Sequence, residues 1–176
     1  MSREIKFPGK SGTVPGKAPL TSFAWVGIAG LAFSLAAFIF SLLLLSGVGE
    51  DWYTMLYAAP LAAFLSGFFG WGILVIVSKR VTLWKGVGAG ALIGLIAHPL
   101  TWYFAILFFY FSGARSSLGE PTLNPVEGLW ASLLYSLLSW LFVGWLTVPI
   151  GAAIGGILAY IQSKRISASG SFTSAS

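Results

Sequence analysis

Only one side chain with versatile acid–base and ligand chemistry falls in the middle of a long apolar stretch of this 176-residue sequence. It is His98, the single histidine, about midway between Val87 and Phe111. Of the five Asp and Glu residues, Glu4 lies in the N-terminal segment and the other four lie between or at the ends of the apolar stretches, and cysteine is absent. Intramembrane catalysis usually requires paired acid–base groups, a nucleophile with its base, or a metal cluster. We therefore predict no catalytic residue, no metal site, no resident cofactor and no enzymatic activity.

His98 should face a neighbouring helix or a cavity, because an imidazole in hydrocarbon without a hydrogen-bond partner is energetically costly. In one interpretation it is a neutral structural residue, hydrogen-bonded to a carbonyl group or to a hydroxyl on another helix. The hydroxyl candidates are Ser34, Ser136, Ser139 and Thr147. In the other interpretations it ligates a haem or other tetrapyrrole, relays protons, gates a path or orients a ligand. A haem with two histidine ligands would need two chains, because no second histidine is present.

Two prolines interrupt apolar stretches near their middle. Because proline lacks an N–H, Pro99 leaves the carbonyl of Leu95 without its helical partner, and Pro149 does the same to Trp145. The two local breaks occur at similar depth. We therefore name His98, Pro99 and Pro149 as candidates for an intramembrane functional or ligand-contacting site.

Aromatic residues follow His98 closely. They are Trp102, Tyr103, Phe104, Phe108, Phe109, Tyr110 and Phe111. They could line a pocket for a lipid, quinone, carotenoid or other apolar ligand. More often such residues face lipid and the membrane interface. Because these seven cover every side of one helix, only part of them can line a pocket.

The elements that must position these residues are long apolar helices. Apolar residues make up 57% of the chain and charged residues only 9%, against about a quarter charged in soluble domains. Four runs are each long enough to cross a bilayer: residues 23–48, 52–77, 86–111 and 126–162. We predict an all-α fold, a four-helix transmembrane bundle over residues 21–163. Residues 1–20 should form a flexible cytoplasmic tail and residues 164–176 a disordered one.

The fourth run has a strong helix-start signal. Asn124 is a good N-cap, Pro125 suits the first helical position, and Glu127 can complete a capping box. The run is longer than a perpendicular span requires. Its first turns should therefore project above the membrane, or the helix should tilt or bend at Pro149.

Basic residues gather on one side of the predicted membrane. Besides those of the N-terminal tail, they are Lys79, Arg80, Lys85, Lys164 and Arg165, and only Arg115 lies on the other side. The positive-inside rule then places both termini in the cytoplasm of a cell carrying this protein in its plasma or inner membrane. Small basic groups that flank apolar runs also argue against nucleic acid as a partner, despite the formal charge of +5.

Glycines are concentrated in the predicted cytoplasmic half, and leucine and aromatic side chains in the outer half. Gly86, Gly90 and Gly94 repeat at every fourth residue, and Gly151 and Gly155 share one face of the fourth run. Small residues let helices approach closely, so we predict that these five pack helices together. The bundle should be pinched near the cytoplasm, splayed outside and filled there by rings. Packing within the chain is favoured over a homodimer seam.

Similar segments close the second and fourth runs. Residues 72–74 and 156–158 both read Gly-Ile-Leu, and residues 78–80 and 163–165 both read Ser-Lys-Arg. A tandem repeat of two helical hairpins would produce this pattern. Two ordinary stop-transfer ends would produce it as well.

The sequence therefore predicts a non-catalytic polytopic membrane protein. It would serve as an accessory or structural subunit or as a self-associating bundle. The alternative is a small oligomeric transporter or channel for an apolar or uncharged substrate, supported by the proline breaks and the glycine-rich faces. No Asp, Glu, Lys or Arg lies at membrane depth, which argues against ion coupling. The expected partners are the lipid bilayer and either another membrane protein or further copies of the chain.

Overall fold

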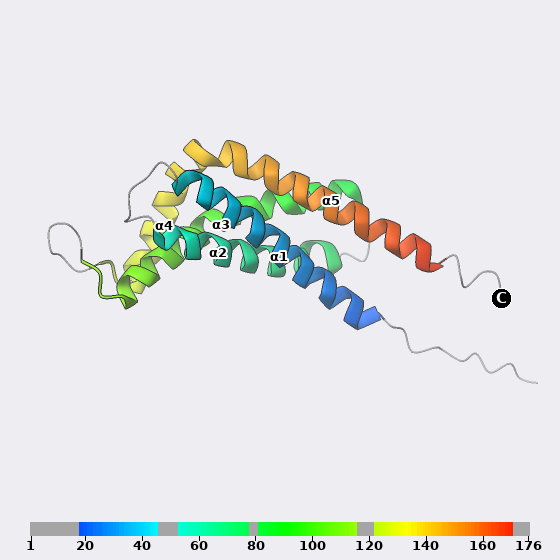
Figure 1. Cartoon of the computed structure of the whole chain (residues 1–176), viewed down its shortest axis with the longest axis horizontal. Coiled ribbons are helices and arrows are strands. Elements are labelled where there is room, and N and C mark those ends of the chain that lie inside the picture. The colour runs from blue at the N-terminus through cyan, green and yellow to red at the C-terminus, as the bar shows by residue number, and fades with distance from the viewer. Residues whose placement is uncertain (1–17, 46–52, 78–80, 116–121, 171–176) are drawn as a thin grey trace, which may run out of the picture.

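The computed structural model describes residues 18–45, 53–77, 81–115 and 122–170, and in these ranges it contains helices and no β-sheet (Figure 1). The elements are α1 (Ala18–Leu45), α2 (Tyr53–Trp71), the π-helical turn η2 (Gly72–Ile76), α3 (Leu83–Phe111), α4 (Pro125–Ser139), the π-helical turn η3 (Trp140–Gly144) and α5 (Trp145–Gly170). Four helical stretches are long and apolar enough to cross a membrane: Ser22–Leu44, Tyr53–Ile76, Leu83–Phe111 and Pro125–Arg165. The all-helical prediction with four such stretches is confirmed. Some predicted features lie outside the described residues. They are most of the N-terminal tail (1–17), the end of the first run and the start of the second (46–52), the basic turn (78–80) and residues 171–176.

The helices form an elongated bundle in which α3 is central (Figure 1). It packs against α2 on one side and against α4 and α5 on the other, while α1 packs along α2. Among the described residues, α1 makes only a small contact with α5 and no extended contact with α4. The start of α1 and the end of α5 lie at the same end of the bundle, opposite the connection between α3 and α4 (Figure 1).

The start of α3 differs from the prediction. The helix begins at Leu83 rather than at Gly86, because Thr82 caps it. The Thr82 hydroxyl accepts a hydrogen bond from the backbone N–H of Lys85 at 3.3 Å, which satisfies one of the unpaired donors of the first turn.

The start of α4 is as predicted. The side-chain oxygen of Asn124 accepts hydrogen bonds from the backbone N–H groups of Val126 and Glu127, both at 3.0 Å. The Glu127 carboxylate accepts in return from the Asn124 backbone N–H at 3.2 Å. The capping box is therefore complete, with Pro125 at the first helical position.

The fourth stretch changes direction at η3, between α4 and α5, and not at Pro149 (Figure 1). The predicted bend at Pro149 is therefore wrong in position, and α5 stays helical through that residue. The carbonyl that a proline ring crowds is four residues before it, here that of Trp145, the first residue of α5. The departure from α-helical geometry accordingly falls in the turn just before Trp145, as a π-helical turn.

The first and last described helices both extend further than predicted. Helix α5 continues to Gly170, so residues 164–170, predicted to be disordered, are helical. No proline or glycine occurs between Gly156 and Gly170 to end it, and Arg165 lies over the Trp25 ring with its guanidinium 5.8 Å from the centroid. Helix α1 likewise begins at Ala18, inside the predicted N-terminal tail.

The apolar core lies where α1, α2, η2, α3 and α5 converge. Its buried members are Ala29, Phe33, Ala63, Trp71, Val75, Ala89, Ile93, Leu158 and Ala159. Four of these nine residues are alanines, which allow the helices to approach closely around the buried Trp71 ring. The two π-helical turns do not occupy matching positions in the similar segments that end at 80 and 165, so the tandem repeat stays a prediction.

Candidate functional site

Helices α3 and α5 touch backbone to backbone through their glycines. A Cβ on Gly90 would overlap the carbonyl oxygen of Gly151, and a Cβ on Gly155 would overlap that of Gly86. On Gly94 it would lie 3.1 Å from the Thr147 carbonyl oxygen. We call this face, formed by Gly86, Gly90, Gly94, Gly151 and Gly155, the glycine contact. It fixes α3 against α5 over two turns and therefore sets where the next residue on the stripe, His98, meets α5.

His98 is buried and bridges two segments of the fourth stretch. Its Nδ1 lies 2.6 Å from the Ser139 hydroxyl at the end of α4, and its Nε2 lies 2.7 Å from the Thr147 hydroxyl in α5. Ser139 and Thr147 are two of the four hydroxyl partners considered from the sequence. The imidazole thus joins the helices on either side of η3, with both ring nitrogens used.

Of the two candidate prolines, Pro99 is connected to this site by a hydrogen bond of a neighbouring residue. The carbonyl of Leu95, which Pro99 leaves without a helical donor, accepts a hydrogen bond from the Trp140 indole N–H at 3.1 Å. Trp140 is the first residue of η3, so the break in α3 and the π turn are joined directly. Neither proline belongs to the walls of the cavity described next, and Pro149 is exposed.

A cavity of about 560 Å³ lies between α1, α2, α3 and the α4–η3–α5 stretch. Residues of α1 and α4, which make no extended contact with each other, both contribute to its walls. Its walls are mainly apolar and include Phe40, Met55, Ala97, Leu138 and Phe142. Among the described residues, no Asp, Glu, Lys or Arg lines it. Ser139, His98 and Thr147 form the polar part of one wall.

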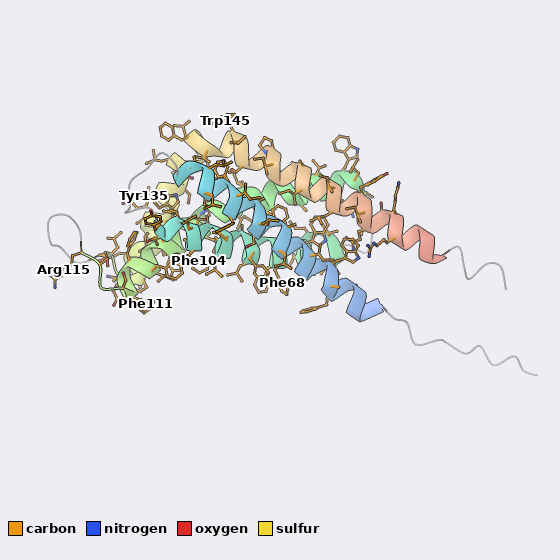
Figure 2. The ribbon with its side chains drawn as sticks, viewed as in Figure 1. Phe68, Phe104, Phe111, Arg115, Tyr135 and Trp145 are labelled. Atoms are coloured by element: carbon orange, nitrogen blue, oxygen red, sulfur yellow. The ribbon has the colours of Figure 1, made fainter. Side chains whose placement is uncertain are left out.

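The aromatic residues near the cavity divide into two groups. Trp102 and Tyr135 line it, with ring centroids 5.1 Å apart. Phe108 and Phe111, by contrast, are exposed on the outside of α3, Phe111 by 77%; Figure 2 shows Phe111 at the edge of the bundle. The expectation that rings fill this half of the bundle is therefore wrong. Although Phe40, Trp102, Tyr135 and Phe142 line the space between the helices, they leave a cavity of about 560 Å³ there.

Trp140 is the site residue that sequence reasoning missed. A signal for it existed, since a tryptophan near the middle of an apolar run is far from the membrane interfaces that tryptophans favour. Its N–H needs a buried acceptor there, and Pro99 supplies one in the Leu95 carbonyl. Trp145, in contrast, points away from the bundle and donates to Phe142 in its own stretch at 2.8 Å (Figure 2).

The described residues bring no group of three His, Asp or Glu side chains together that could hold a metal ion. His98 itself has both nitrogens occupied by hydroxyls, an arrangement suited to hydrogen bonding with a neutral imidazole. The groups that line this site could recognise a molecule by its shape, by apolar contact and by hydrogen bonds to a few hydroxyl groups. Comparison with models of protein families, with curated proteins and with solved structures finds no match to this chain.

Proposed function

We propose that this chain is a non-catalytic, multi-pass membrane protein that holds an apolar small molecule between its helices. The observation that carries the proposal is the cavity of about 560 Å³. Its size falls within the roughly 300–1,000 Å³ of small-molecule sites, which are concave, mostly apolar and carry a few placed polar groups. Binding inside one chain requires no second copy.

The proposed setting is a bilayer, with both termini in the cytoplasm. Lys164 and Arg165 lie near the end of α5, at the end of the bundle where α1 begins, and Arg115 lies at the opposite end (Figure 2). This charge distribution supports the cytoplasmic assignment through the positive-inside rule. The cavity would then sit at membrane depth, where apolar molecules dissolved in the bilayer can reach it.

The ligand should be uncharged. A charged group at membrane depth needs a counter-charge or water, and the described cavity walls contain neither an acidic nor a basic side chain. Ser41, Thr101 and the hydroxyls around His98 are the polar contributors. Fatty acid anions and quaternary ammonium compounds are therefore poor candidates.

Filling the cavity tests the proposal. Ala97 lines the cavity, whereas its neighbour Ile96 is 43% exposed on the outside of the same helix. We expect Ala97→Phe to reduce the amount of ligand that copurifies at least about tenfold, and Ile96→Phe to leave it unchanged. The measurement is mass spectrometry of organic extracts from detergent-purified protein, normalised to protein.

The proposal fails if the wild-type protein yields no compound beyond the detergent and bulk lipid seen with an unrelated membrane protein. It also fails if the two variants retain equal amounts of ligand. The size of the purified particle, and any polypeptides that copurify, report on a role as an accessory subunit or a self-associating bundle.

A second candidate is transport of the same molecule, which the π-helical turn η3 favours. Its residues Phe142 and Val143 line the cavity, and π turns in helices are frequent at functional sites, where the helix can change register. Flux of a labelled ligand between leaflets of proteoliposomes would support transport. Ligand retention without flux would leave the binding role alone.

A further inference from the structure

Three consecutive hydrogen bonds connect the polar groups along one wall of the cavity. Ser139 Oγ lies 2.6 Å from His98 Nδ1, and His98 Nε2 lies 2.7 Å from Thr147 Oγ1. Thr147 Oγ1 in turn lies 3.3 Å from the backbone carbonyl oxygen of Val143. The Val143 carbonyl can only accept a hydrogen bond. It therefore ends the series on one side, and the Ser139 hydroxyl ends it on the other.

The number of available protons determines which group donates in each of these three hydrogen bonds. A neutral imidazole has one N–H donor and one acceptor nitrogen, and each hydroxyl has one proton. All three bonds form only if Thr147 donates to Val143, His98 Nε2–H donates to Thr147, and Ser139 donates to His98 Nδ1. The reverse tautomer, with the proton on Nδ1, leaves the Val143 carbonyl without the Thr147 proton.

Ser139 also differs from the other hydroxyl groups around it. Ser132, Ser136 and Thr101 each donate to a carbonyl of their own helix, those of Leu129, Ser132 and Ala97. Such back-bonding is the usual outcome for a hydroxyl in a membrane helix. Ser139 donates to His98 instead and lines the cavity. Its oxygen therefore keeps lone pairs that can accept a hydrogen bond from a molecule in the cavity.

We propose, on the premise that the cavity binds an apolar molecule, that its ligand is an uncharged apolar alcohol whose hydroxyl donates to Ser139 Oγ. The lining residues of α1 run from Phe33 to Leu44, a length of roughly 16 Å at the rise of an α-helix. This apolar wall accommodates the body of the ligand. The hydroxyl lies against the opposite wall, where His98 orients the Ser139 oxygen.

Brominated probes of matched length distinguish the ligand classes. The protein is reconstituted in phosphatidylcholine vesicles, and quenching of tryptophan fluorescence is titrated with 12-bromododecan-1-ol, its methyl ether and 1-bromododecane. Trp102 lines the cavity and serves as the reporter, so Trp102→Phe defines the quenching that arises elsewhere. Concentrations are expressed in the lipid phase from partition coefficients measured on protein-free vesicles.

We expect the alcohol to quench Trp102 at a concentration roughly five- to tenfold lower than either other probe, which corresponds to one hydrogen bond. Ser139→Ala should remove this preference without weakening the binding of 1-bromododecane, and Ser139→Thr should restore it. Ser136→Ala, which removes a hydroxyl bonded within α4, should keep the preference.

The outcomes separate the two proposals. Equal quenching by all three probes, or stronger quenching by the ether than by the alcohol, overturns the alcohol ligand while leaving the cavity as a binding site. Absence of Trp102-dependent quenching by every probe overturns the binding function itself. Retention of the alcohol preference in Ser139→Ala overturns the role of Ser139.

Discussion

Helix α3 takes part in two contrasting regions of the bundle. At the glycine contact its backbone touches that of α5, and no side chain fits between Gly90 and Gly151. From Ile93 onward the same helix also borders a cavity of about 560 Å³, whose lining includes Gly94 of the glycine contact as well as Ala97 and His98. The difference shows that one helix can be tightly packed along part of its length and border a cavity along the next part. The proposed function assigns helix packing to the first region and ligand binding to the second.

Residue size is the physical cause of this contrast. Inside a bilayer helices gain no hydrophobic driving force from associating, so van der Waals packing and interhelical hydrogen bonds must hold them. The glycines supply the packing, and His98 and Trp140 supply the hydrogen bonds to the neighbouring stretch.

The largest expected effect comes from inserting a side chain into the glycine contact. Gly90→Leu would drive a Cβ into the Gly151 carbonyl, a backbone atom that cannot rotate away. We expect a loss of about 3 kcal/mol or more in the free energy of unfolding, measured by denaturant titration in mixed micelles.

Gly88→Leu is the matched control, because a Cβ there meets nothing within 4 Å. It should be neutral or slightly stabilising, since leucine is a better helix former than glycine. Equal losses in the two variants would show that helix α3, and not its contact with α5, is sensitive to substitution.

Removal of the imidazole should have the next largest effect. His98→Ala leaves the Ser139 and Thr147 hydroxyls without their shared partner, at an expected cost of about 1–3 kcal/mol in the same unfolding measurement. Unchanged stability would contradict the bridging role. A visible absorption band in the wild-type protein that His98→Ala abolishes would instead identify a pigment ligand.

The smallest expected effect on the free energy of unfolding comes from comparing Trp140 and Trp145, two tryptophans of the fourth stretch whose N–H groups donate to different helices. Trp140→Phe removes the N–H that donates to the Leu95 carbonyl across the helix interface. We expect a cost of about 0.6–1.7 kcal/mol, from the average to the maximum found for interhelical hydrogen bonds in a membrane protein. Trp145→Phe removes a bond within its own stretch from a residue that is 71% exposed. It should change unfolding by less than about 0.5 kcal/mol. A larger loss in Trp145→Phe than in Trp140→Phe would contradict the account.

The helical architecture was largely predictable because it depends on local signals. The four apolar runs and the capping box at Asn124 are written in consecutive residues, and both are found in the structure. The serine and threonine partners of His98 were likewise accessible, since a buried imidazole requires such groups.

What could not be predicted depends on how helices fit together. Pro149 indicated a disturbance in the fourth run but not its form, a π-helical turn at Trp140–Gly144, nor the hydrogen bond that Trp140 donates to the Leu95 carbonyl on another helix. The cavity was also beyond reach. Aromatic residues alone do not show whether their rings turn inward, as Trp102 does, or outward, as Phe111 does.

Placing the same side chain in both regions of α3 tests the central contrast most directly. Ala89 is 5% exposed in the packed core, and Ala97 borders the cavity two turns away. The measurement is the free energy of unfolding of Ala89→Phe and Ala97→Phe in one detergent. We predict a loss of about 3 kcal/mol or more for Ala89→Phe, and no loss for Ala97→Phe, whose ring enters empty space. Equal destabilisation by the two variants would contradict the presence of a hollow region beside a packed one.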